Sequence, residues 1–386
     1  MKKVIIVPDS FKGALTAGEA TDIIAAAVAE AFPECEIIKM PIADGGEGSV
    51  DAVLSAIGGR IFSAQVLSPD ERIITATYGI ADNGTAVLEM AQSSGITRQN
   101  GLHPMTSNTF GFGQLILAAL NVDRSGSCGD NIILCIGGSA TTDGGCGMAA
   151  ALGVRFLDKE GKEFVPSGET LCEIAGLDMS GIDKRIKNCC FTVMCDVDNP
   201  LFGENGAAFI YGPQKGADSE MVHILDNGLR HYGIILKKQF EQSFDDIPGA
   251  GAAGGLGAGC VAFLDAKLKS GIDTILDLYN FKEQCKDADL VITGEGKLDS
   301  QSFQGKVLSG ILGAAGAVPV MSICGVNDCD EEILRKNRLV VFQASEGVTI
   351  EDSMREPEKY LKLAAQRAMA AQRAMAAQRA MEREKL

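Results

Sequence analysis

Apolar and polar positions follow a similar order at the two ends of the chain. Near the start, the apolar run 3–7 predicts a strand and the alanine-rich segment 16–32 predicts a helix. Thr16 followed three residues later by Glu19 is typical of a helix start. Further strands are predicted at 35–40, 289–294, 318–325 and 339–345, and further helices at 50–58, 305–316 and 330–337. This alternation of strand, loop and helix indicates a parallel sheet with helices on its faces.

The middle of the chain has a different pattern. Short β-like runs at 60–66, 72–80 and 85–91 predict strands, and Asp-Asn-Gly at 82–84 predicts a hairpin between two of them. An antiparallel or mixed sheet is expected here. The apolar runs 132–138 and 190–197 then lead into loops of small residues.

The length and these two patterns together predict the domain organisation. A chain of 386 residues favours two domains, or one with a large insertion. Two strands at the front and three at the back would form one doubly wound parallel sheet of five strands. We predict an α/β fold in which residues 1–60 and 286–386 form one discontinuous domain, and residues 61–285 form an inserted α/β domain with a mixed sheet.

The tail contains the hexapeptide AAQRAM three times, at 364–369, 370–375 and 376–381. Its residues are strong helix formers. A six-residue period rotates each copy by about a third of a turn, so the repeats alone give no single apolar face. The repeats therefore predict a solvated helical extension, or a segment that arose by duplication.

Charge and composition narrow the classes of function. The formal net charge of −16 argues against binding to nucleic acid or to an anionic membrane. No apolar run approaches the roughly 20 residues that span a bilayer, and the apolar stretch after the first residues is too short for a signal peptide. Twelve cysteines without a C-x-x-C spacing, beside only three histidines, argue against a zinc site or a disulfide framework. We expect a cytoplasmic globular protein.

Six glycine-rich loops follow predicted strands, which is where open α/β sheets bind their ligands. Glycine lets backbone N–H groups approach an anion closely. The loops are PDSFKGALTAGE (8–19), ADGGEGS (43–49), GGSATTDGGCG (137–147), CDVDNPLFG (195–203), GPQKGAD (212–218) and GEGKLDSQSFQGK (294–306). They carry Lys12, Lys215, Lys297 and Lys306, and lysines beside glycine turns in an acidic protein suggest an anionic ligand. One such loop alone is more often only a turn and a helix cap, and one lysine alone is more often a solvated surface charge.

Two well-known nucleotide motifs are not found as functional units. The chain has no G-x-x-x-x-G-K-[ST], which excludes an ordinary P-loop. A G-x-G-x-x-G occurs at 249–254, but it follows Phe-Asp-Asp-Ile-Pro and not a strand. We interpret the segment 249–259 as either a tight packing turn or another anion-binding loop.

Carboxylates in these loops suggest phosphoryl transfer. Such a reaction needs one carboxylate near the attacking hydroxyl and one or two that hold Mg²⁺. The candidates are Asp44, Asp143, Asp196, Asp198 and Asp299. For Asp196 and Asp198 the alternative is loop capping. The three histidines have no partner spacing and are interpreted as structural.

The order of these loops and their amino-acid sequences resemble those of one known family. The motifs PDSFKGALTAGEA, PIADGGEG, GGSATTDGG, CDVDNPL, GPQKGA and TGEGKLDSQS resemble those of the bacterial glycerate kinases of the first type, over residues 1–350. The resemblance implies ATP-dependent phosphorylation of D-glycerate, generally to 2-phosphoglycerate, with 3-phosphoglycerate as the alternative product. It also implies a flavodoxin-like domain interrupted by a second α/β domain, with the site in the cleft between them.

The resemblance and the loop chemistry together give a predicted site. Asp196 is the predicted base, with Asp44 and Asp198 as alternatives for base or metal ligand, and Lys12 is counted among the catalytic residues. The predicted glycerate-binding residues are Asp9, Ser10, Lys12, Arg60, Lys297 and Asp299. The predicted ATP-binding residues are Gly137, Gly138, Ser139, Thr141, Thr142, Asp143, Lys215 and Lys306, and the predicted Mg²⁺ ligands are Asp196 and Asp198.

Two other classes of protein compete with this prediction. A nicotinamide oxidoreductase would need a G-x-G-x-x-G directly after the first strand, where this chain has PDSFKG instead. A non-catalytic nucleotide-binding module would keep the glycine loops without needing the lysines and carboxylates. The sequence leaves the oligomeric state open.

Overall fold

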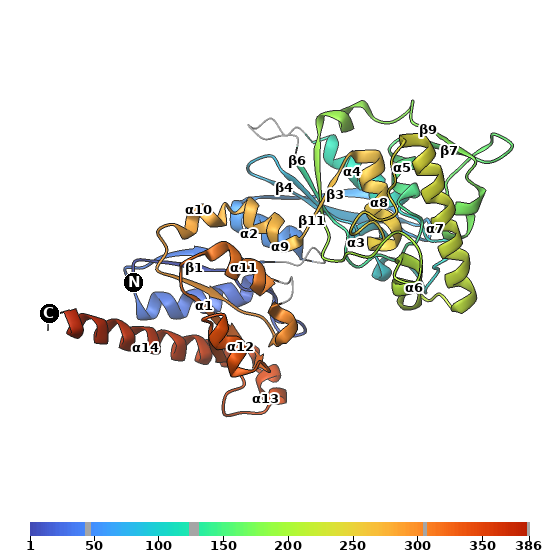
Figure 1. Cartoon of the computed structure of the whole chain (residues 1–386). Helices are drawn as coiled ribbons and strands as arrows, with labels where there is room; N and C mark the ends of the chain where they lie inside the picture. Colours follow the sequence, from blue (N-terminus) through green and yellow to red (C-terminus); the bar gives the residue numbers. More distant parts are fainter. Residues whose placement is uncertain (43–47, 123–130, 304–306, 384–386) are drawn as a thin grey trace. The chain divides into compact units, whose positions relative to one another are not determined.

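A computed structural model of the chain describes residues 1–42, 48–122, 131–303 and 307–383 (Figure 1). The chain divides into two compact units. Unit 1 contains Met1–Asp44 and Ile272–Leu386, and unit 2 contains Gly45–Gly271. Each unit has its own sheet and its own core.

Unit 1 is built on a five-stranded parallel sheet with the order β16-β14-β12-β1-β2. Counted along unit 1, this is the strand order 2-1-3-4-5 of flavodoxin-like folds, so the predicted doubly wound sheet is confirmed. The central strands are buried at every position because both of their faces are covered, whereas the edge strands are partly exposed. The strands are β1 (Lys3–Ile6), β2 (Glu36–Lys39), β12 (Leu290–Thr293), β14 (Val320–Cys324) and β16 (Val340–Gln343), and a small second sheet pairs β13 (Lys297–Leu298) with β15 (Val326–Asn327).

The helices of unit 1 include one whose start was predicted in detail. Helix α1 (Ala17–Ala31) begins with a capping box, in which the Glu19 backbone N–H donates to Thr16 Oγ1 at 3.2 Å and the Thr16 N–H donates to Glu19 Oε2 at 2.8 Å. The other helices are α9 (Gly271–Leu278), which starts at the last residue of unit 2, α10 (Phe281–Cys285), α11 (Val307–Ala315), α12 (Glu331–Lys336), α13 (Ile350–Arg355) and α14 (Pro357–Arg383).

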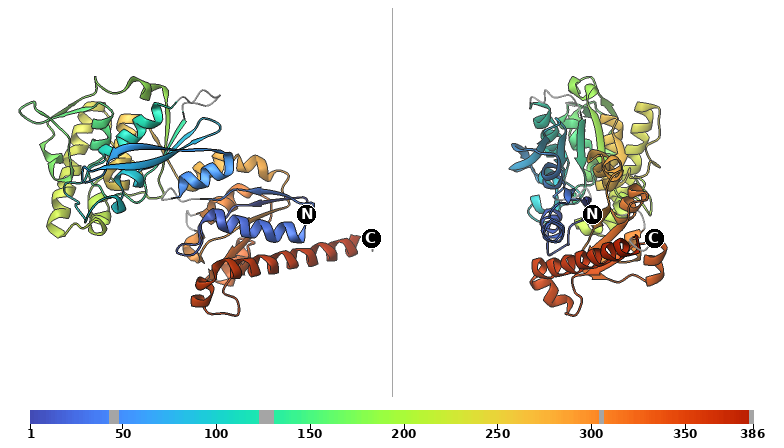
Figure 2. Two further views of the ribbon diagram at one scale, coloured as in Figure 1. Left: turned by 180° about the vertical axis from the view of Figure 1, so that it is seen from behind. Right: turned by 90° about the vertical axis from the view of Figure 1, so that its left-hand side faces the viewer.

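The tail helix α14 corrects one prediction. It packs along α1, and the two helices lie side by side in both views of Figure 2. The buried face contains Leu361, Ala364, Ala365, Ala368 and Met369, each at most 1% exposed. The prediction of a solvated extension is therefore wrong for the first AAQRAM copy, because Leu361 just upstream extends its alanines into an i, i+3, i+4, i+7 face. For residues 373–378 the prediction is confirmed, since they are exposed.

Unit 2 is built on a six-stranded mixed sheet with the order β11-β10-β6-β5-β4-β3. The four strands from β11 to β5 are parallel, and β4 and β3 are antiparallel additions. The mixed sheet and the hairpin at 82–84 are thus confirmed, with Gly84 at φ +85° in the turn. The strands are β3 (Gly59–Leu67), β4 (Ile73–Ala81), β5 (Ala86–Glu89), β6 (Asn131–Cys135), β10 (Cys190–Met194) and β11 (Lys267–Lys269). A separate sheet of β7 (Arg155–Leu157), β8 (Glu163–Phe164) and β9 (Gly176–Asp178) was not predicted.

The helices of unit 2 pack around the mixed sheet and around each other in a second cluster of buried side chains. They are α2 (Ser49–Ile57), α3 (Ala91–Ser94), α4 (Phe110–Leu120), α5 (Cys146–Ala151), α6 (Ala207–Tyr211), α7 (Ser219–Phe240) and α8 (Ala252–Leu264). Short 3-10 turns lie at η1 (Ile96–Arg98), η2 (Gly168–Glu173), η3 (Lys184–Asn188) and η4 (Pro213–Lys215). Within the described ranges no helix has both the length and the apolar character that crossing a membrane requires.

The limits of the two units differ from the predicted domain limits after residues 60 and 285. Helix α2 packs on β4 and β5, which are strands of unit 2. Helix α10 packs on α11 in unit 1. The sequence pattern did not reveal these contacts because α2 continues the same strand-loop-helix alternation that builds unit 1.

Candidate active site

In unit 2, the parallel strands β5, β6 and β10 end in one row. Glu89 is in register with Cys135, and Cys135 with Met194. The loops that follow β5 and β6 are joined by backbone hydrogen bonds, from Ala140 N to Ser94 O at 3.0 Å and from Ile96 N to Gly138 O at 3.1 Å. Ligands of open α/β sheets bind at this carboxyl edge. The GGSATTDGG loop therefore starts at the edge where a ligand is expected.

Asp143 holds this loop in shape. Its side chain is fully buried, and Oδ2 accepts hydrogen bonds from Thr109 N at 2.8 Å, Thr109 Oγ1 at 2.7 Å and Gly147 N at 3.0 Å. Oδ1 accepts from Gly145 N at 3.2 Å. Burial raises the pKa of Asp143, and these donors oppose the increase. Both carboxylate oxygens thus accept hydrogen bonds from the protein, and Asp143 positions the loop.

Lys215 lies beside the same loop in an unusual environment. Its side chain is 1% exposed, and Nζ donates to the carbonyl oxygen of Thr141 at 2.6 Å. Burial lowers the pKa of Lys215 to about 7, although the negative charge of Asp143 acts in the opposite direction. A lysine ammonium has three N–H donors. The described contacts of Lys215 therefore leave room for a further hydrogen-bond acceptor.

Two buried hydroxyl groups of the same loop also have unused hydrogen-bonding capacity. Thr141 and Thr142 are fully buried, and neither Oγ1 atom has a hydrogen-bond partner within the described part of the chain. Buried polar atoms are rarely left unpaired, because that costs about 1–3 kcal/mol for each group. Two hydroxyls and an ammonium group around one loop are suited to an anion such as a phosphate.

The glycine-dense segment 249–259 is a packing turn under this loop. Gly144 N donates to Gly254 O at 3.0 Å. Gly254 has φ +72°, and a Cβ atom there would lie 2.0 Å from the carbonyl oxygen of Thr141. Only glycine fits at that distance. Of the two interpretations of the G-x-G-x-x-G sequence, these contacts support close packing.

Asp196 and Asp198 follow β10 and are exposed. Asp196 Oδ1 accepts a hydrogen bond from Gly271 N at 2.8 Å, where β11 gives way to α9. This hydrogen bond fits loop capping, which is the structural alternative to a catalytic role for Asp196. Exposure of the side chain is compatible with a second, chemical role. Among the described residues, no group of three or more His, Cys, Asp or Glu side chains could hold a metal ion.

In unit 1, the loops after the neighbouring strands β1 and β12 lie side by side. Asp9 N donates to Gly294 O at 2.8 Å, and a Cβ atom on Gly296 would lie 3.4 Å from Lys12 N. Asp9 and Ser10 are half-buried, while Lys12 is exposed. The structure thus brings the PDSFK and GEGKLD segments together, because β1 and β12 are neighbours in the sheet.

The charged groups of the second of these loops are paired with each other. Lys297 Nζ lies 3.0 Å from Asp328 Oδ2 and 3.8 Å from Asp299 Oδ2. The hydrogen bond with Asp328 raises the pKa of Lys297. Asp299 Oδ1 also accepts from Gln301 N at 2.9 Å, at the start of the 3-10 turn η5 (Ser300–Phe303). These are exposed or half-exposed ion pairs, in contrast to the buried Lys215.

Among the predicted residues that the structure describes in unit 2, Arg60 is not brought to the loops at the carboxyl ends of the strands. Arg60 is exposed on the edge strand β3, in the row of residues that contains Ile80, Ala86 and Ile132. That row lies toward the amino ends of the parallel strands, away from the GGSATTDGG loop. Asp44 and Lys306 lie outside the described residues. The predicted cleft between two domains stays a prediction.

Two residues of the unit 2 site were missed by the sequence analysis. Thr109 donates to Asp143 and also accepts from Met148 N at 2.8 Å. Glu89 ends the buried strand β5 at 3% exposed and accepts from Val50 N at 2.8 Å, and burial raises its pKa. A charged residue at the end of an apolar strand is a usable signal for Glu89. Thr109 gave no such signal, since its partner is 34 positions away.

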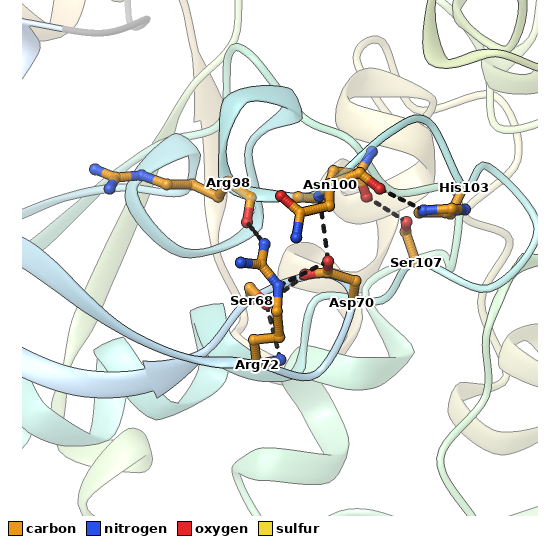
Figure 3. A network of polar contacts seen from close by, with 8 residues as sticks. Ser68, Asp70, Arg72, Arg98, Asn100, His103 and Ser107 are labelled. Atoms are coloured by element: carbon orange, nitrogen blue, oxygen red, sulfur yellow. Dashed lines mark hydrogen bonds and ion pairs between the residues drawn. The ribbon is translucent and has the colours of Figure 1, made fainter.

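A network of polar contacts orders the segment that leads to Thr109 (Figure 3). Arg72 Nε donates to Asp70 Oδ2 at 2.9 Å, and Arg72 Nη2 donates to the carbonyl oxygen of Arg98 at 2.9 Å. Asn100 N donates to Asp70 Oδ2 at 3.2 Å. Burial raises the pKa of Asp70, but these hydrogen bonds outweigh burial and lower it below the ordinary value. In Figure 3 the guanidinium group of Arg98 points away from this network.

These features define an α/β enzyme with two units, in which loops at the carboxyl ends of parallel strands are suited to an anionic ligand. A family model described as "Glycerate kinase family" matches residues 4–373. The chain therefore belongs to the glycerate kinase family, and the prediction of a kinase of this kind is confirmed.

Individual relatives agree with this assignment over almost the whole chain. The "Glycerate kinase" of Bacillus subtilis (strain 168) is 41% identical over 371 residues, which cover 94% of this chain and 96% of that protein. The "Glycerate 2-kinase" of Escherichia coli (strain K12) is 42% identical and covers 92% and 93% respectively. The crystal structure of a putative glycerate kinase 2 from Salmonella typhimurium LT2 has a TM-score of 0.85 and 37% identity, covering 97% of this chain and 99% of that one.

Proposed function

We propose that the protein transfers the γ-phosphoryl group of ATP to D-glycerate and forms 2-phospho-D-glycerate. The observation that carries the proposal is the GGSATTDGG loop, which presents buried, unpaired hydroxyls next to a buried lysine. The product is proposed from the similarity to relatives whose names specify a glycerate 2-kinase or glycerate kinase 2. 3-Phosphoglycerate is the alternative product.

In this proposal, ATP is bound by the loop and by Lys215. Gly137 and Gly138 are the more accessible part of the loop, while residues 139–147 are buried. Backbone N–H groups at glycines, together with the Thr141 and Thr142 hydroxyls, would donate to phosphate oxygens. Lys215 would add a positive charge once an anion raises its pKa. Asp143 would keep the donors in place.

Asp196 and Asp198 would hold Mg²⁺. Mg²⁺ is typically bound by one or two carboxylates and completes its coordination with waters and substrate phosphates, which two exposed aspartates can satisfy. When bound, the ion neutralises charge on the phosphate oxygens during transfer. Asp196 is also the proposed base for the attacking hydroxyl, and Asp44 and Asp198 remain the alternatives.

The substrate carboxylate would be bound by residues of the paired loops in unit 1. Lys12 and Ser10 supply a charge and a hydroxyl group, and Asp9 would orient the loop, since its Oδ1 accepts from Ser10 N at 2.6 Å. Lys297 and Asp299 would contribute from the neighbouring loop. Arg60 is left out of this set because it belongs to the edge strand β3 of unit 2 and not to these loops.

We also propose that the protein acts in the cytoplasm on small molecules, without nucleic acid or a membrane as partner. The eleven described cysteines are free thiols, which suits a reducing compartment. The formal net charge of −16 disfavours anionic polymers and surfaces.

A coupled assay of ADP release tests the activity. With ATP and Mg²⁺ present, we expect ADP release to depend on D-glycerate, and ADP release that is unchanged without glycerate would contradict the proposal. Phosphorus NMR of the product then identifies the hydroxyl. A phosphorus atom on O2 couples to one C–H proton and one on O3 to two, so a doublet indicates 2-phosphoglycerate and a triplet indicates 3-phosphoglycerate.

A further inference from the structure

The strand β3 forms an open edge of the unit 2 sheet. It contains nine residues and pairs continuously with the nine residues of β4, without a bulge. It is the last strand in the sheet order, so one side of its backbone has no neighbouring strand. Monomeric proteins usually protect such an edge with a proline, a bulge or inward-pointing charges. β3 has neither a proline nor a bulge, and its one charged residue, Arg60, lies near its start.

The hydrogen-bond register shows which backbone groups of β3 face outward. Asp82 N donates to Gly58 O and Ser68 N donates to Arg72 O, at the two ends of the strand pair. Even-numbered residues therefore bond to β4, and the N–H and C=O groups of odd-numbered residues point away from it. At one end, Leu67 N donates to Gln114 Oε1 at 2.7 Å. The outward groups of Ile61, Ser63 and Gln65 have no such partner in the described part of the chain.

The charge distribution favours contact between two copies at this strand. The whole chain has a formal net charge of −16, so two copies repel each other over most of their surfaces. In β3 and β4 together, Arg60 is the only charged residue. Ile61 is 57% exposed on β3. In the described part of the chain, this strand combines low charge, an exposed apolar side chain and unpaired outward backbone groups.

We propose that β3 is a homodimer interface, in which two copies of the strand pair antiparallel about a two-fold axis at Ser63. This pairing places Ile61 opposite Gln65 of the second copy and Ser63 opposite Ser63. In each of these pairs the backbone N–H and C=O groups of both residues point outward, so the two residues can exchange two hydrogen bonds. Arg60 falls opposite Val66, so no like charges meet. The two mixed sheets then continue into one another across the axis.

Sedimentation of the full-length protein over a concentration series tests the proposal. We expect a monomer–dimer equilibrium. Ser63→Pro removes an outward N–H group from each copy at the axis and leaves the bonds to β4 in place, so the dimer dissociation constant should rise roughly tenfold or more. A protein that sediments as a monomer at every concentration overturns the proposal, and so does a dimer that Ser63→Pro leaves unchanged.

Charged variants keep the test valid if the proline variant does not fold. Ser63→Lys and Ser63→Glu each place like charges opposite one another, and each should be monomeric alone and form a heterodimer when the two are mixed. Ile73→Lys is the matched control, since it adds the same charge to the neighbouring strand away from the axis and should leave dimerisation unchanged. A mixture that remains monomeric contradicts pairing at Ser63.

The outward edge of β3 could be covered either by a second copy or by another part of the same chain. Amide hydrogen exchange distinguishes these two cases. We expect the amides of Ile61, Ser63 and Gln65 to be protected in the wild-type dimer and to exchange rapidly in monomeric Ser63→Lys. Equal protection in both would mean that another part of the same chain covers the edge, and the proposal would be wrong.

Discussion

The two groups of candidate site loops differ in how completely they are formed by the protein alone. In unit 2, the GGSATTDGG loop is buried, is held by Asp143, and contains a lysine and two hydroxyls with unused donors. In unit 1, the loops after β1 and β12 are more exposed, and Lys297 is already paired with Asp328. Under the proposed function, unit 2 would supply the more fully preformed anion site, and the loops of unit 1 would complete theirs with the substrate.

The strongest test of this comparison substitutes a carboxylate in each group. Asp196→Asn should lower turnover by roughly 10²–10⁴-fold, because the proposed base and metal ligand is lost. Asp299→Asn, the matched change in unit 1, should alter turnover by less than about tenfold. The measurement is ADP release at saturating ATP and D-glycerate. Equal effects of the two substitutions would contradict the assignment of the chemistry to Asp196.

The second test concerns the rigidity of the unit 2 loop. In Asp143→Asn an amide N–H₂ group replaces one acceptor, so buried N–H groups lose their partner. The free energy of unfolding should fall by about 3 kcal/mol. Urea unfolding measures this, with Asp299→Asn as the control, because its side chain is half-exposed and its loss should cost under about 1 kcal/mol. An Asp143→Asn variant as stable as the parent would show that the loop does not depend on this carboxylate.

The third test compares the buried and the exposed lysine. Lys215→Met should raise the Michaelis constant for ATP by roughly tenfold or more, with a smaller effect on that for D-glycerate, because a charge-assisted contact to phosphate is lost. Lys297→Met is the matched change in unit 1. We expect it to affect D-glycerate more than ATP. If both variants changed the same constant, the two groups of loops would not have separate ligands.

The fourth test concerns the exposed side of the unit 1 site. Lys12→Ala should raise the Michaelis constant for D-glycerate by about tenfold, which corresponds to the loss of one charge-assisted hydrogen bond. The constant for ATP should change less. The reverse order would assign Lys12 to the nucleotide and would remove the distinction between the two units.

The smallest expected effect is the uptake of protons when ATP binds. Burial lowers the pKa of Lys215 to about 7, so at pH 8 the free protein holds this side chain mainly neutral. A bound phosphate favours the charged form and raises that pKa, so ATP binding at pH 8 should take up as much as about one proton. Calorimetry in buffers of different ionisation enthalpy measures the uptake. Lys215→Met should take up less, and identical uptake would exclude Lys215 as the group that titrates.

The sequence predicted the sheets better than it predicted the chemistry of the loops. Strands β1 and β12 are continuous apolar runs. Such runs identify central parallel strands from local sequence alone. The adjacent positions of Lys12 and Gly296 followed from that strand order. The burial of Lys215 was not predictable, because its contact with Thr141 joins positions 74 residues apart. For the same reason, Asp143 was predicted as a ligand-binding residue, and its bonds to Thr109 were not foreseen.

The tail helix has a consequence for how this chain can vary. The first AAQRAM copy is fixed by its contacts with α1, and residues 373–378 beyond it are exposed. Replication slippage that adds or deletes one hexapeptide after Met369 leaves the packed copy in register with its partner. A change in the number of distal repeats should therefore leave the packing on α1 intact, whereas a shift of a single residue before Met369 would rotate the buried face away from α1.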